Sequence, residues 1–160
     1  MRCWLMKSEP DVFSIADLRR QGTTLWDGVR NHQARNHMQA MAVGDRVLFY
    51  HSNGRPSGVA GLAEVSRTGI PDHTAWDPDS DYFDPRSPPD APRWWMVEVR
   101  FVAAFADVLP LDRLRSMPEL QDMDLFRLPR LSVQAVEPRH YEQVIALGGI
   151  RTGQREGAPA

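Results

Sequence analysis

The segment Trp94–Phe105, WWMVEVRFVAAF, decides the fold class, because it carries the longest strand pattern in the chain. Residues two apart in a strand point to the same face, so the segment presents two distinct sides. The core side is expected to hold Trp95, Val97, Val99 and Phe101. The opposite, partly solvated side is expected to hold Trp94, Met96, Glu98 and Arg100.

Shorter elements surround this segment. Patterns rich in β-branched and aromatic residues predict further strands at 2–6, 46–51, 58–65 and 131–136. Capping residues, Gly stops and Pro starts predict short helices from Ser14 to Gly22, from Asn31 to about Met41, and over 111–117, 119–123 and 138–147. Short strands interrupted by helices, without regular βαβ alternation, predict an α+β domain on an antiparallel sheet or partial barrel.

Residues 69–93 have a different composition, with frequent Asp and Pro. They predict a long extended loop, a type of segment that is often functional. Within it, Asp77-Pro78-Asp79-Ser80-Asp81 resembles the opening of a calcium loop, but Tyr82 and Pro88 stand where Gly and Glu are required. A solvated acidic loop is the expected structure.

Composition indicates one globular domain: the chain has 160 residues, of which 42% are apolar. No apolar run approaches the ~20 residues of a membrane helix, and the start lacks a signal-peptide core, so a cytoplasmic, membrane-free monomer is expected. Cys3 is the single cysteine, which excludes an intrachain disulfide and a Cys-based zinc site. The net charge of −2 argues against a protein that coats nucleic acid electrostatically.

Standard catalytic motifs are absent from the sequence. It has no Gly-x-Ser-x-Gly elbow, phosphate loop or Gly-x-Gly-x-x-Gly, and its five His residues show no i, i+4 pair, so neither a cofactor nor a metal is expected. A nucleophile such as Ser8 or Ser52 activated by His51 stays open, because such arrangements are set in space.

The segment Trp26–Arg35 combines an indole, a flexible Gly28, and the hydrogen-bonding side chains of Arg30 and Asn31. This set suits a planar ligand with polar edges, such as a nucleobase. The alternative is a buried Trp at a turn before an ordinary helix. Further polar residues stand at predicted strand ends, at 7–9 and 51–53, and Lys7 is the only Lys beside 18 Arg. If these ends converge, they form a concave site with aromatic walls.

Six blocks in order together resemble the EVE domain family. They are Trp4–Pro10, Trp26–Asn31 with Ala34–Asn36, Tyr50–Ser52, Gly58–Gly61, Trp95–Phe101 and Arg130–Gln134. The resemblance runs from about residue 2 to 147. It implies a PUA-like domain over 1–147, a small β pseudo-barrel of mostly antiparallel strands flanked by short helices. Residues 148–160 are expected to form a disordered tail.

The resemblance also implies a function: a reader that accepts a flipped, modified nucleobase without changing it chemically. Modified cytosine in DNA is the favoured ligand, ahead of RNA. Carried onto this chain, the pocket would be lined by Lys7, Ser8, Glu9, Trp26, Arg30, Asn31, His51 and Ser52, with Ser132 and Val133 adding a wall.

Roles follow from residue chemistry. Trp26 would stack on the base; Ser8, Asn31 and Ser52 would read its edge; Lys7 and Arg30 would meet a phosphate or carbonyl. Two rival functions remain at this level. One is an enzyme acting on nucleotides or RNA through Lys7, Glu9 or His51. The other is a protein-interaction domain that uses the acidic loop 69–93.

Overall fold

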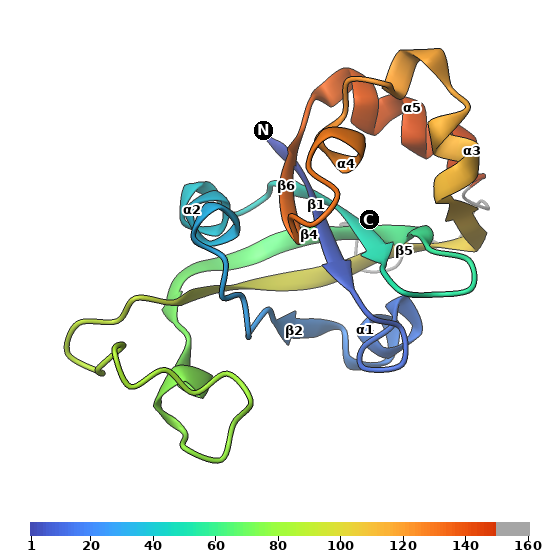
Figure 1. The fold of residues 1–160 in the computed structure, drawn as a ribbon. Helices are drawn as coiled ribbons and strands as arrows, with labels where there is room; N and C mark the ends of the chain where they lie inside the picture. Colours follow the sequence, from blue (N-terminus) through green and yellow to red (C-terminus); the bar gives the residue numbers. More distant parts are fainter. Residues whose placement is uncertain (150–160) are drawn as a thin grey trace.

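The computed structural model describes residues 1–149 and contains an open, six-stranded mixed sheet with helices on both faces (Figure 1). The strands are β1 (Cys3–Ser8), β2 (Thr23–Leu25), β3 (Arg46–His51), β4 (Gly58–Pro71), β5 (Trp95–Pro110) and β6 (Val133–Val136). Their order across the sheet is β2-β5-β4-β3-β1-β6. The α+β class is confirmed; the sheet is curved but not closed, with β2 and β6 as its edges.

Every neighbouring pair of strands is antiparallel except β1 and β3. In that pair Leu5 lies opposite Leu48 and Ser8 opposite His51, so both strands end at the same place. Parallel neighbours need a long crossover, which here contains α1 (Ile15–Gln21), β2 and α2 (His32–Ala40). The parallel pairing therefore places the polar C-terminal ends of β1 and β3 side by side.

Two apolar clusters lie on the two faces of the sheet. Trp4 and Met6 of β1 pack toward Leu18 of α1 and Met38 of α2, while the alternate residue Leu5 belongs to the other cluster. The helices that contribute residues to this second cluster are α3 (Leu111–Arg115), α4 (Asp124–Arg127) and α5 (Pro138–Gly148), together with the 3₁₀ turn η2 (Pro118–Leu120). The sheet is thus covered on one face by α1 and α2, and on the other by α3 to α5.

The expected faces of β5 need one correction. Val97, Val99 and Phe101 are buried as predicted, but Trp95 is only half-buried, whereas Trp94 and Met96 are buried instead of partly solvated. Trp94 is covered because the 72–93 loop folds back on it: the indole Nε1–H donates to Asp84 at 2.6 Å. The alternation of residues along a strand predicts which side chains share a face, but it does not show whether a loop covers that face.

Several element boundaries also differ from those expected. β4 and β5 extend well beyond the predicted ends, β2 was not predicted, and the loop contains a 3₁₀ turn, η1 (His73–Trp76). The capping box predicted at Ser14 and Asp17 is present at the start of α1. The helix α5 continues through Gly148, and the remainder of the expected disordered tail, 150–160, lies outside the described residues. No helix within residues 1–149 is long and apolar enough to cross a bilayer.

Candidate functional site

A cavity of about 900 Å³ opens where β1 and β3 end together. Its walls come from the end of β1, the turn after β3, the 24–31 segment, Tyr82 of the long loop, and residues before β6. Eight of the ten residues expected at the site line it: Lys7, Ser8, Glu9, Trp26, Arg30, Asn31, Ser52 and Ser132. The backbone hydrogen bonds between β1 and β3 continue one residue beyond the end of β3, since the Ser52 N–H donates to the Ser8 carbonyl at 3.0 Å.

His51 and Val133, the other two expected residues, do not line the cavity. His51 is 8% exposed, and its Nε2 accepts a hydrogen bond from the Ile15 N–H at 3.1 Å. Burial lowers the pKa of His51, which favours the neutral ring that this bond requires. Val133 is fully buried in the core. Each lies beside a lining residue, Ser52 or Ser132, and neighbouring residues in an extended chain point in opposite directions.

Trp26 is both a core residue and part of the cavity wall. It is 8% exposed, and its ring meets Phe49 edge-on, with centroids 5.5 Å apart and planes at 81°. The Trp26 N–H also donates to the Val97 carbonyl, which fixes the backbone against β5. The two alternatives considered for this Trp are therefore compatible: the ring is buried, and its remaining accessible part borders the cavity.

Arg30 does not present free donors to the cavity, contrary to the role expected for it. Nε and Nη2 both donate to the Tyr82 carbonyl, Nη1 donates to the Val29 carbonyl and to Asp72, and Nη2 also donates to Thr74. A guanidinium has five N–H donors, so all are used. Arg30 holds the long loop against the wall of the cavity.

Lys7 has the opposite character. Its Nζ donates to the Pro129 carbonyl at 2.7 Å and lies 5.7 Å from the Tyr50 ring centroid, and no carboxylate pairs with it among the described residues. Burial lowers the pKa of Lys7. An ammonium has three N–H donors, and one is used by Pro129. The two others remain for a ligand that accepts hydrogen bonds.

The remaining polar side chains are partly engaged. Ser8 Oγ donates to the Phe13 carbonyl at 2.6 Å, so the hydroxyl can only accept from a ligand. Asn31 Oδ1 caps α2 by accepting from the Ala34 N–H at 2.9 Å, which leaves the amide NH₂. Glu9 is exposed and accepts from Asn53 Nδ2 at 2.9 Å. Of the three residues considered for an acid or base role, His51 is engaged with the backbone outside the cavity, whereas Lys7 and Glu9 line it.

Comparison with known proteins now identifies the domain. The family model of the EVE domain matches residues 2–147 of this chain. The chain belongs to the EVE domain family. Human thymocyte nuclear protein 1 is 40% identical over 163 residues, covering 90% of this chain and 72% of that protein. A structure from Leishmania major is 53% identical with a TM-score of 0.90, covering 92% of this chain and 94% of that one.

A third comparison concerns a structure with a ligand. Human THYN1 protein, solved in complex with 5-methylcytosine-containing DNA, is 39% identical to this chain with a TM-score of 0.88. The match covers 99% of this chain and 100% of that one. The fold around the cavity of this EVE domain is therefore shared with a protein that has been solved with methylated DNA.

The cavity residues of this EVE domain that sequence reasoning missed include Tyr82 and Asp27. The Tyr82 ring lies against Gly28, where a Cβ would fall 2.6 Å from the ring, and Arg30 lies 5.6 Å from its centroid. Gly28 has φ +77°, and its N–H donates to Asp72 at 2.8 Å. The Gly in the Trp-Asp-Gly sequence was the available signal, since Gly often marks a close approach. Nothing in the sequence identified Tyr82 as its partner.

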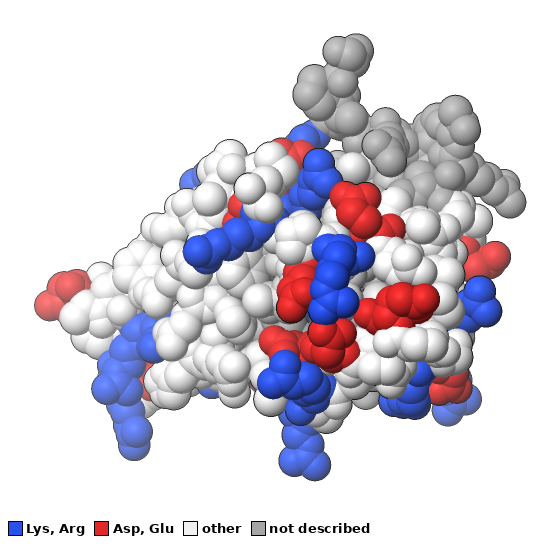
Figure 2. All heavy atoms as spheres, turned by 90° about the horizontal axis from the view of Figure 1, so that it is seen from above, with Lys and Arg blue, Asp and Glu red and all other residues white. Residues whose placement is uncertain are grey.

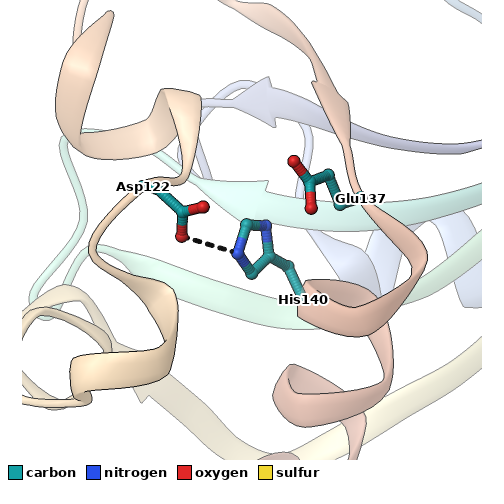
Figure 3. Close-up of side chains that lie close together, drawn as sticks. All are labelled: Asp122, Glu137 and His140. Carbon is teal, nitrogen blue, oxygen red and sulfur yellow. Dashed lines mark hydrogen bonds and ion pairs between the residues drawn. The ribbon is translucent and has the colours of Figure 1, made fainter.

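A second polar cluster lies away from the cavity. Asp122, Glu137 and His140 bring three potential metal ligands within 4.8 Å of one another, and Figure 3 shows His140 bonded to Asp122. Arg139, however, pairs with both carboxylates and offsets part of their charge. The cluster is best explained as a polar link between α5 and the segment before α4.

The surface above the helices α3 to α5 carries mixed charge. Figure 2 shows basic and acidic side chains side by side there, with no continuous basic field. Nucleic-acid surfaces are typically dominated by positive charge. The described part of this face therefore lacks the positive charge typical of a surface that binds a phosphate backbone.

Proposed function

We propose that this EVE domain binds a modified cytosine of DNA in the cavity at the ends of β1 and β3, without changing the base chemically. The observation that carries the proposal is the cavity itself: its volume of about 900 Å³ lies in the range of small-ligand sites, and Trp26 borders it together with the unused donors of Lys7 and Asn31. Stacking and edge hydrogen bonds are the two interactions by which proteins hold an unstacked base.

The relative solved with 5-methylcytosine-containing DNA supports this ligand class. It shares the fold over nearly the whole chain, including the segments that form the cavity. Because the cavity is recessed, the base would have to leave the duplex to enter it. Binding without reaction is supported by the engagement of His51 Nε2 with the backbone of Ile15, which removes one of the side chains considered as a general base.

Fluorescence anisotropy with matched duplexes tests the proposal. The duplexes contain one 5-methylcytosine or one cytosine at the same position, and the protein is titrated into each. Burying one methyl group is worth about 0.8 kcal/mol, so the methylated duplex should bind roughly fourfold more tightly. Equal affinity for both duplexes would refute the proposed ligand. Mass spectrometry of the recovered DNA should show an unchanged base, and a chemically altered base would instead support an enzyme.

A further inference from the structure

Several hydrogen-bond donors at the wall of the cavity are already used by the protein. All five donors of Arg30 and the hydroxyl hydrogen of Ser8 have partners. Lys7 and Asn31 keep free donors, and among residues 1–149 the lining side chains of Arg130, Ser52 and Ser132 also donate to no other protein group. A pyrimidine offers acceptors at its ring carbonyl, and in cytosine at N3 as well, so Lys7 and Asn31 suit that part of the base. Neither of them can accept a hydrogen bond from the exocyclic amine.

The side chains at the cavity that can accept include the Ser8 hydroxyl, the Glu9 carboxylate, which already accepts from Asn53, and the Asp27 carboxylate. Of these, Asp27 is adjacent in the chain to Trp26, the residue proposed to stack on the base. It lines the cavity between Trp26 and Gly28. Among residues 1–149 its carboxylate has no ion-pair partner, and its own backbone N–H is the group that donates to it. Burial, with a further contribution from the nearby Asp72 charge, raises the pKa of Asp27. Its own backbone N–H and the charges of His73 and Arg30 oppose this shift, and Asp27 remains exposed, so the carboxylate keeps acceptor capacity for a ligand.

Asp72, the nearest comparable carboxylate, shows the difference. It accepts from Gly28, from Arg30, and from both the N–H and the hydroxyl of Thr74. Although burial opposes it, these hydrogen bonds lower the pKa of Asp72. The two carboxylates are close, but one is fully satisfied inside the wall and the other faces the cavity with acceptor capacity left.

Resting on the proposed function, we propose that Asp27 selects cytosine-type over thymine-type bases by accepting a hydrogen bond from the exocyclic amine. 5-Methylcytosine and thymine carry the same methyl group, but cytosine presents an amine donor at position 4 where thymine presents a carbonyl acceptor. A carboxylate attracts the former and repels the latter. Lys7 and Asn31 donate to the other polar atoms of the base.

The test compares the two bases without a difference in pairing. Duplexes carry 5-methylcytosine or thymine opposite an abasic site, so that neither base loses a partner when it enters the cavity. The wild-type protein should prefer 5-methylcytosine by about 10- to 100-fold, the discrimination expected of a good base-edge contact. In Asp27→Asn the amide can turn and donate to the thymine carbonyl, so the preference should fall to within about threefold.

A second measurement removes the amine from the ligand. A duplex with 5-methyl-2-pyrimidinone, which lacks the exocyclic amine, is compared with 5-methylcytosine for the wild type and for Asp27→Ala. Wild-type affinity should fall about tenfold on loss of the amine, whereas Asp27→Ala should bind both duplexes equally, because the interaction is already absent. This coupling cannot arise from a general loss of folding. Asp107→Asn, an exposed carboxylate on β5 away from the cavity, is the charge-matched control and should keep the wild-type ratios.

The outcomes separate the two proposals. If Asp27→Asn retains the wild-type preference for 5-methylcytosine over thymine, or if removal of the amine weakens Asp27→Ala as much as wild type, the role of Asp27 is refuted and the proposed function stands. If the wild-type protein does not distinguish 5-methylcytosine from cytosine in the preceding titration, the proposed function fails first.

Discussion

The guanidinium of Arg30 lies 3.0 Å from the Asp72 carboxylate, whose side chain is completely buried. Through this pair the wall of the cavity at 28–30 is joined to the loop that follows β4. Breaking a buried pair leaves an uncompensated charge, which costs far more than the loss of an exposed one.

We therefore expect Arg30→Ala to lower the free energy of unfolding by about 3 kcal/mol, since it removes the charge partner of the buried Asp72 carboxylate together with five hydrogen bonds. Urea unfolding measures this directly. Arg20→Ala, which removes an exposed pair with Asp17, is the control and should cost less than about 1 kcal/mol. A comparable small loss in both variants would show that Arg30 does not hold the loop.

The close contact between Gly28 and Tyr82 predicts a second effect. Gly28→Ala meets both a positive φ and the Tyr82 ring, so it should cost roughly 1–3 kcal/mol of stability and weaken base binding. Gly69→Ala is a matched control, because Gly69 has a similar φ of +70° but no atom within 4 Å of the added Cβ. Gly69→Ala should lower the free energy of unfolding but leave the affinity for the base unchanged. Weakened binding in Gly69→Ala as well would attribute the effect to strain and not to the cavity wall.

Trp26 should be tested with a conservative substitution, because Trp26→Ala would remove a core side chain and cost about 3–5 kcal/mol. Trp26→Phe retains the aromatic contact with Phe49 but offers the ligand a smaller surface, so binding should weaken about three- to tenfold in the anisotropy assay. Trp76→Phe lies outside the cavity and should bind as wild type. If Trp26→Phe also binds as wild type, this indole makes no contact with the base.

His51 predicts a pH dependence of stability. Its pKa is lowered by burial in the folded state, so the unfolded chain binds more protons just below the ordinary value of 6.5, and the free energy of unfolding falls as the pH drops through that window. His51→Gln, whose amide oxygen can still accept from Ile15, should flatten this slope by up to about 1.4 kcal/mol per pH unit.

Urea unfolding between about pH 7 and pH 5 measures the slope in both proteins. His37, whose pKa is also lowered mainly by burial, is retained in both and contributes equally. The carboxylates with lowered pKa, such as Asp72, lose their contribution only below their ordinary value of 3.8 and do not interfere. An unchanged slope in His51→Gln would contradict the lowered pKa of His51 in the folded state.

Local sequence patterns predicted the elements that are stabilised by interactions between residues close together in the chain. The capping box at Ser14 depends on residues three apart, and the apolar sequence of β3 produces a strand in almost any sheet. By contrast, the burial of Trp94 and the unpredicted strand β2 depend on partners distant in the chain. Sequence periodicity contains no information about those partners.

For the site, the sequence determined which residue types stand at the strand ends and in the Trp26–Arg35 segment, because residue identity and local turn chemistry are properties of the chain itself. The tertiary structure alone decided what each residue is free to do. The parallel pairing of β1 with β3 brought Lys7, Ser8 and Ser52 to one cavity, and the loop closed over Gly28 through Tyr82. Within residues 1–149 the fold used every donor of Arg30 and left the Asp27 carboxylate without an ion-pair partner. Hydrogen-bonding capacity depends on neighbours in space, which only the folded chain provides.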